Sequence, residues 1–335
     1  MEKVLLFNEV SILNASIEKI VRLIVSLFMF VATFGLVSCN SNDDENGTIE
    51  IDGIDLRADI DCCSAEEALQ VYKFLQTVKI VPELSTTIDN KYNVFAYTKT
   101  GTFHKGYNDV YFVVTKKSTG NYVKNYEINN ITPLMFMTKM NMSHSTPVGG
   151  VVSQLENLPL ALKHGWVSYL MDSSENGSWT ISYDISVLGS EGGIKSKDIT
   201  VDALPQGQEW LKSFKIGSDT YYLSLVNPID FATGTNEISA YISKKNTPAT
   251  TPYSLAAETF TVEIDPRMPD MGNHTSPDNV KLTRQPDGSY KGIINLTMTG
   301  LWRIHLTVKD ANGNVVGGGD DLKDGLSSRY WDVTL

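Results

Sequence analysis

The amino-acid sequence predicts an all-β protein of two tandem immunoglobulin-like β-sandwich domains, with a short N-terminal helix and a disordered N-terminal tether. Three observations support this fold class. The 335 residues are enough for two domains, and 41% hydrophobic and 20% charged content is typical of a globular protein. Tyr, Thr, Val, Ile, Asn and Gly are plentiful while long helical periodicity is scarce, which favours strands and turns. Finally, the second half of the chain repeats landmarks of the first.

The first 38 residues have the pattern of an export signal. Lys19 and Arg22 precede an apolar run from Leu23 to Val37, which is short for a membrane-spanning helix and leads into Leu-Val-Ser-Cys. That ending resembles the lipobox of bacterial lipoproteins, in which the Cys39 thiol receives a diacylglyceryl group and becomes the mature N-terminus. The prediction is therefore a signal peptide over residues 1–38 and a lipid anchor at Cys39. The alternative is an uncleaved membrane anchor that ends in an ordinary cysteine.

Residues 39–50 form the predicted tether, because their Asn, Ser, Asp and Glu side chains have little apolar surface to bury. Acidic residues soon after the cysteine resemble the surface-export signal of Bacteroidetes lipoproteins. We therefore expect an outer-membrane lipoprotein, on the cell surface or facing the periplasm, with the membrane as a partner through its lipid. Nucleic acid is not an expected partner, because a net charge of −11 does not suit phosphate binding.

A short helix is expected next, from Ala65 to about Gln76, because Ser64 and Glu67 have the spacing of a capping box. The adjacent cysteines Cys62 and Cys63 precede it. Neighbouring cysteines bridge only through a strained ring, so a structural disulfide is not expected. Free thiols, a redox pair and soft metal ligands remain open, but two small apolar residues before a helix are favoured.

Two β-sandwich domains are predicted, over residues 51–205 and 206–335, with a linker at Pro205-Gln206-Gly207. In the first domain, strands are expected over residues 92–98, 109–115, 121–128, 131–144, 166–171, 179–189 and 199–204. The second domain repeats four landmarks of the first in the same order, at offsets of 123 to 130 residues. They are Tyr221–Val226 for Tyr92–Tyr97, Gly234–Ile238 for Gly106–Val110, His274 for His144, and Gly300-Leu301-Trp302 for Gly177-Ser178-Trp179. About seven strands and one core tryptophan per copy indicate an immunoglobulin-like sandwich.

Two short stretches combine methionine with histidine and predict a metal site. Met140, Met142 and His144 are spaced by two residues, so an extended strand would put all three on one face. Met268, Met271 and His274 are spaced by three, which would align them along one edge of a polyproline II segment. Thioether sulfur is soft and selects Cu(I), and imidazole adds affinity for Cu(II). The expected cofactor is therefore copper, with Cu(I) preferred.

Packing is the competing interpretation, since methionine is a common filler of cores. Met135 and Met137 alternate around Phe136 and are expected to be core residues. For the first stretch, ligand and core remain open alternatives. In the second stretch the interleaved polar and small residues Asp270, Gly272 and Asn273 favour ligands in a loop.

Other soft or imidazole side chains are less clearly placed by the sequence. Met171 and Met298 lie near the sandwich tryptophans, where they are either core residues or additional soft ligands. His104, His164 and His305 have no partner pattern, and the alternating register around His305 predicts a strand-face residue.

The second copy resembles the YtkA-like domain and is similar to the FixH group, which are exported β-sandwich domains linked to copper handling. The resemblance rests on Met268-Pro269-x-Met271-x-x-His274, Tyr290–Met298 and Gly300-x-Trp302-x-Ile304-x-Leu306. The first copy resembles a divergent member, with Pro133-Leu134-Met135-x-Met137 before Met140-x-Met142-x-His144-Ser145. Together the copies span roughly residues 90–310. The resemblance implies copper more firmly than any one process.

Catalytic motifs are absent from the sequence, which has no Gly-x-Ser-x-Gly elbow, zinc-protease helix or phosphate loop. The protein is therefore not expected to be an enzyme. Two functions compete: a copper-binding or copper-delivering lipoprotein, whose partner would be a copper-accepting or copper-exporting envelope protein, and a surface adhesion or ligand-binding module with structural methionines. Convergence of the sulfurs and the imidazole of each stretch on one accessible point would favour copper, whereas side chains that point into separate cores would favour the adhesion or ligand-binding module.

Overall fold

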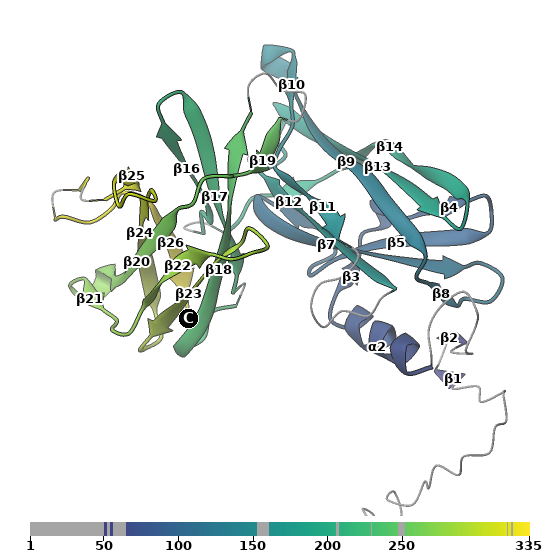
Figure 1. Ribbon diagram of the computed structural model, residues 1–335, viewed down its shortest axis with the longest axis horizontal. Coiled ribbons are helices and arrows are strands. Elements are labelled where there is room, and N and C mark those ends of the chain that lie inside the picture. Colours follow the sequence, from purple (N-terminus) through teal and green to yellow (C-terminus); the bar gives the residue numbers. More distant parts are fainter. Residues whose placement is uncertain are drawn as a thin grey trace, which may run out of the picture. The chain divides into compact units, whose positions relative to one another are not determined.

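Over the residues that it describes, the computed structural model is mostly β-structure with one short helix near the N-terminus, and its sheets are antiparallel except for one two-stranded parallel pair (Figure 1). It describes residues 50–51, 54–55, 65–152, 161–205, 208–228, 230–246, 252–319, 321–322 and 324–335. The predicted signal peptide, the predicted lipidation site Cys39, nearly all of the predicted tether, and Cys62 and Cys63 lie outside these residues. Within them, no helix has the length and apolar character needed to cross a membrane.

The expected helix is present as α2 (Ala65–Leu75). Its first turn carries Glu66 and Glu67 and its last turn carries Lys73, which suits the helix dipole. Ala68 and Val71 are buried in a small cluster with side chains of the neighbouring sheet. The short strands β1 (Glu50–Ile51) and β2 (Ile54–Asp55) pair with each other ahead of it.

Two sheets enclose the first core. The seven-stranded sheet has the order β11-β12-β7-β5-β3, with β4 and β8 attached, and the four-stranded sheet has the order β10-β9-β13-β14. Their bounds are β3 Lys79–Ile80, β4 Thr86–Ile88, β5 Tyr92–Thr98, β7 Gly106–Lys116, β8 Tyr122–Val123, β9 Tyr126–Met137, β10 Met142–His144, β11 Val148–Val152, β12 Leu162–Tyr169, β13 Gly177–Val187 and β14 Ser190–Ile199. A 3-10 turn, η1 (Pro82–Leu84), follows β3, and β6 (Phe103–His104) pairs in parallel with β15 (Val201–Asp202).

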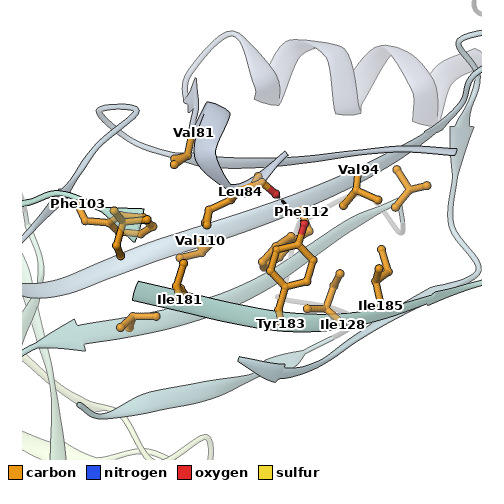
Figure 2. Packing of buried hydrophobic residues seen from close by; sticks show 14 of the residues in the cluster. Val81, Leu84, Val94, Phe103, Val110, Phe112, Ile128, Ile181, Tyr183 and Ile185 are labelled. Carbon is orange, nitrogen blue, oxygen red and sulfur yellow. Dashed lines mark hydrogen bonds between the residues drawn. The ribbon is translucent and has the colours of Figure 1, made fainter. Parts of the chain in front are cut away.

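Side chains of both sheets meet in this core because burial alternates along the strands (Figure 2). The rings of Phe112 and Tyr183 lie 5.3 Å apart in an edge-to-face contact. The Tyr183 hydroxyl donates a hydrogen bond to the Leu84 carbonyl at 2.6 Å, so a deeply buried polar atom is satisfied. The result is one continuous apolar core from Val81 to Val201.

The second core lies within one eleven-stranded sheet of order β16-β17-β18-β23-β22-β20-β24-β25, to which β19, β21 and β26 are attached. In this order β22 joins β23 to β20, so all eleven strands belong to one sheet, which is nearly closed and barrel-like. Its strands are β16 Leu211–Ile216, β17 Asp219–Asn227, β18 Gly234–Lys245, β19 Tyr253–Leu255, β20 Thr261–Met268, β21 His274–Thr275, β22 Val280–Arg284, β23 Tyr290–Leu296, β24 Leu301–Lys309, β25 Val315–Gly318 and β26 Tyr330–Thr334.

The loops that lead into β7 and β18, which the sequence repeat matches to each other, have the same local hydrogen bonds. The Asn108 amide donates to the carbonyls of His104 and Gly106 and accepts from the His104 N–H. Asn236 makes the same three bonds with Ala232 and Gly234. Gly106 and Gly234 have φ of 91° and 94°, a conformation that suits glycine. In both places the loop thus enters its strand in the same way.

Three strand expectations need correction. The stretch 131–144 is not one strand, because β9 ends at Met137 and the chain reverses before β10. The stretch 121–128 is divided between β8 and β9, and 199–204 contributes only the end of β14 and the two residues of β15. Continuous β-propensity alone did not reveal these breaks.

Candidate metal-binding hairpins

The first methionine-rich stretch forms a tight hairpin, here called the His144 hairpin (residues 135–144). Strand β9 ends at Met137, the 3-10 turn η2 (Thr138–Met140) follows, and Asn141 takes the left-handed conformation with φ of 47°. β10 then runs back along β9 as the edge strand of the four-stranded sheet. A short polar turn thus folds the stretch onto itself.

The register of this hairpin puts three thioethers and the imidazole on one sheet face. Met142 pairs with Met137, and His144 pairs with Met135. Opposite residues, and residues two apart on one strand, share a face. Met135 is fully buried, Met137 is partly buried against the core, and Met142 is 52% exposed. Sulfur is therefore present on this face from the core to the solvent.

The His144 ring is held in a defined state. Its Nδ1 lies 3.0 Å from the Ser145 carbonyl oxygen, which can only accept, so Nδ1 carries the proton. In the neutral ring this leaves the lone pair on Nε2. Nε2 is shielded from solvent and has no hydrogen-bond partner among the residues that the structure describes. A buried nitrogen lone pair without a partner is uncommon and calls for an explanation.

Trp179 completes this row of residues. It pairs with Met135 on the side opposite His144, and its ring meets the His144 ring edge-to-face at 5.6 Å. The Trp179 Nε1 donates to the Met171 carbonyl at 3.0 Å, which fixes the indole. A Cβ on Gly177 would lie 2.1 Å from the Met135 methyl group, so glycine makes room for the thioether.

The second stretch forms a shorter hairpin, the His274 hairpin (residues 268–275). β20 ends at Met268, the 3-10 turn η3 (Pro269–Met271) follows, and Gly272 and Asn273 are both left-handed. β21 returns with His274 opposite Met268. Met268 is buried in the second core, whereas Met271 is 53% exposed and His274 is exposed.

A tryptophan also flanks this second pair. The register of β20 and β24 brings Trp302 alongside Met268, and the His274 and Trp302 rings lie 6.3 Å apart. Trp302 Nε1 donates to the Met298 carbonyl at 2.9 Å, as Trp179 does to Met171. A Cβ on Gly300 would lie 2.8 Å from the Met268 methyl group. Both hairpins therefore place methionine between histidine and tryptophan, with a nearby glycine.

Two geometric expectations were wrong. Met140, Met142 and His144 do not share a strand face, because Met140 lies in η2, where it is 54% exposed. The second stretch is not a polyproline II segment, because η3 and two left-handed residues turn the chain back. The structure brings Met142 and His144 together with Met135 and Met137, and it brings His274 together with Met268; the exposed Met140 and Met271 lie at the turns.

Sequence reasoning missed the tryptophans and Met135 as neighbours of the histidines. The repeated Gly-x-Trp pattern at 177–179 and 300–302 was the available signal. It was used to detect the repeat but not to build a site, because cross-strand register cannot be seen in spacing along one strand.

The remaining histidines have structural partners. His164 Nε2 lies 2.6 Å from Asp109, which also accepts from the Tyr107 hydroxyl at 2.7 Å. Burial, with the Asp109 carboxylate beside it, raises the pKa of Tyr107. His104 Nδ1 faces the Lys105 carbonyl at 2.9 Å, and the buried His305, on β24 as expected, faces the Ser327 carbonyl at 2.5 Å.

Within the described part of the chain, no group of three or more His, Cys, Asp or Glu side chains is arranged to hold a metal ion. The chain matches no protein-family model and no curated protein sequence.

Proposed function

We propose that the protein binds Cu(I) through its methionine–histidine hairpins. The observation that carries this proposal is the His144 hairpin, where an imidazole with a free, shielded Nε2 shares a face with three thioethers. Soft, neutral sulfur with one imidazole suits Cu(I) better than harder divalent ions. The ligands supported at this hairpin are His144, Met142 and Met137, with Met135 behind them. Met140 and Met271 lie in the turns η2 and η3, outside the strand pairs whose register aligns sulfur with imidazole.

The fold that we propose around these hairpins is a pair of tandem immunoglobulin-like sandwiches, over residues 51–205 and 206–335. The matching Asn108 and Asn236 loops and the two His–Met–Trp rows support two copies of one domain. Membership in the YtkA-like and FixH-like group remains part of this proposal. The copies would act without catalysis, binding copper or delivering it to an accepting or exporting envelope protein.

We further propose that the protein is held at the outer membrane by lipid on Cys39. The lipobox-like ending and the polar stretch after it support this. A Cys39→Ser variant is expected to move from the membrane fraction to the soluble fraction, measured by fractionation and immunoblotting. A Cys62→Ser variant serves as the control and should stay in the membrane fraction. Retention of the Cys39→Ser protein in the membrane fraction would contradict the anchor.

The copper proposal is tested by competition with a chromophoric Cu(I) chelator of micromolar affinity. The full chain is used in detergent, in a Cys62→Ser and Cys63→Ser background that removes thiols able to bind Cu(I). We expect the protein to withdraw copper from the chelator and to prefer Cu(I) over Zn(II). His144→Gln and Met142→Ala should each weaken binding by about tenfold or more.

Two matched variants control this titration. His104→Gln removes an imidazole that also faces the next residue's carbonyl, and Leu134→Ala removes a 41% exposed side chain from the other face of β9. Neither should change copper affinity. If no copper is withdrawn, the adhesion or ligand-binding function is preferred, since full burial of Met135 and near-full burial of Met268 also fit methionines that act as packing.

A further inference from the structure

We infer that the two hairpins bind a soft monovalent ion unequally: the His144 hairpin fills first and retains the ion, while the His274 hairpin fills second and exchanges it. This inference rests on the proposed function, and it assigns different roles to two stretches in which the sequence places the same types of ligand, two methionines and one histidine. Three differences between the hairpins carry it.

The first difference is the number of donors on the shared face. In the His144 hairpin the register aligns Met135, Met137 and Met142 with the imidazole. In the His274 hairpin only Met268 is aligned with the imidazole, because β20 ends there and the chain turns at once. Met271, the other methionine of this hairpin, lies on the turn itself. More convergent donors mean tighter binding of a soft ion.

The second difference is how well the imidazole ring is ordered before an ion binds. The Ser145 carbonyl holds the His144 Nδ1 proton and so assigns the lone pair to Nε2 before any ion arrives. The ring is further held edge-to-face against Trp179. The exposed His274 ring lies farther from its tryptophan, with a tilt of 54°. A ligand that is already ordered loses less entropy on binding.

The third difference is access. His144 Nε2 is shielded from solvent, whereas the His274 side chain is exposed. Exchange of an ion between proteins requires an incoming ligand to reach the metal while the outgoing ligands still hold it. The exposed hairpin allows this approach, and the shielded Nε2 of the other hairpin restricts it. Together the three differences assign retention to the His144 hairpin and exchange to the His274 hairpin.

The order of filling can be measured with Ag(I), a soft monovalent ion that does not undergo redox reactions under these conditions. The full chain, in the background lacking Cys62 and Cys63 thiols, is labelled with 5-fluorotryptophan and followed by fluorine NMR. Trp→Phe variants assign the resonances of Trp179 and Trp302, which report the two hairpins separately. We expect the first equivalent of Ag(I) to shift the Trp179 resonance and the second equivalent to shift Trp302.

Removal of the ion provides the reverse test. Added chelator should restore the Trp302 resonance first, and affinities should differ by about tenfold or more. In His144→Gln the Trp302 resonance should respond from the start of the titration, whereas His104→Gln should behave as the parent. Simultaneous shifts, or a Trp302 shift that comes first, overturn the inference but leave metal binding intact. If neither resonance shifts and the protein takes no Ag(I) from the chelator, the proposed function itself fails.

Discussion

At the scale of single residues, each hairpin depends on a glycine that leaves space for a methionine. Gly177 faces the Met135 methyl group and Gly300 faces the Met268 methyl group. The two methionines lie in well-packed cores, where even one added methyl group disturbs the packing. The position of each thioether beside its tryptophan is therefore determined by the absence of a side chain on the neighbouring strand.

Gly177→Ala is expected to destabilise the protein by about 1–2 kcal/mol, because the new Cβ would lie 2.1 Å from the buried Met135 methyl group and force it to move. Chemical denaturation measures this. In a Met135→Ala background the same substitution should cost nearly nothing, since the clashing group is gone. The exposed Ser178→Ala is the control. An equal loss of stability in both backgrounds would contradict the clash.

At the scale of elements, the reversal between β9 and β10 decides which residues share a face. Asn141 sits at the end of η2 with φ of 47° and ψ of 46°, a conformation that asparagine tolerates better than most residues. Gly272 takes the same place after η3, with φ of 64°. A residue that resists this conformation should loosen the hairpin without touching any sulfur or imidazole.

Asn141→Val is therefore expected to cost about 1–2 kcal/mol, since a β-branched residue is disfavoured with positive φ. It should also weaken Cu(I) binding, because Met142 and His144 would lose their register with Met137 and Met135. Asn141→Gly is the matched control, in which the conformation stays accessible. Denaturation and copper titration are measured together; unchanged stability and affinity in the valine variant would show that the turn does not order the site.

Much of the strand content could be predicted from the sequence, whereas the geometry of the site could not. Alternating burial along β13 follows from its alternating apolar and polar residues, whereas β9 ends in a continuous apolar run in which Leu134 and Phe136 are exposed. The turn at 138–141 contains neither glycine nor proline, so the Met-rich stretch resembled a continuing strand. The second turn did contain signals, Pro269 and Gly272-Asn273, but a spacing of three was given more weight than the turn chemistry.

At the scale of the whole molecule, the limits of prediction come from non-local pairing. The second set of strands forms one nearly closed sheet through pairs such as β18 with β23 and β20 with β24, whose strands are separated in the sequence by other strands. Local patterns carry no information on this. Repeated landmarks were more informative, because the Asn108 and Asn236 loops match in hydrogen bonds and in glycine conformation.

We expect the loss of folding stability at acidic pH to depend on a charge cluster around Lys244. The Lys244 ammonium group lies 2.8 Å from the Asp219 carboxylate and 2.8 Å from the Glu258 carboxylate. Partial burial alone would raise the pKa of Glu258. Hydrogen bonds from Lys244, the Glu258 backbone and Tyr221 outweigh that effect and hold the pKa at about 2. The carboxylate is thus favoured in the folded state relative to the unfolded chain, where the pKa is about 4.3.

The direction of the pH effect follows from this lowered pKa. The contribution of Glu258 to stability is fully present above about pH 4.3, and it is lost as pH falls towards about 2, because the folded state must then take up a proton at a site that favours the anion. Partial exposure of both partners keeps the effect small. Lys244→Met should therefore flatten the fall in stability between about pH 4.3 and 2, measured by urea denaturation at several pH values. Lys291→Met, which removes the more exposed pair with Glu237 at 3.5 Å, should leave that slope nearly unchanged. An unchanged slope in Lys244→Met would mean that other carboxylates control the acid transition.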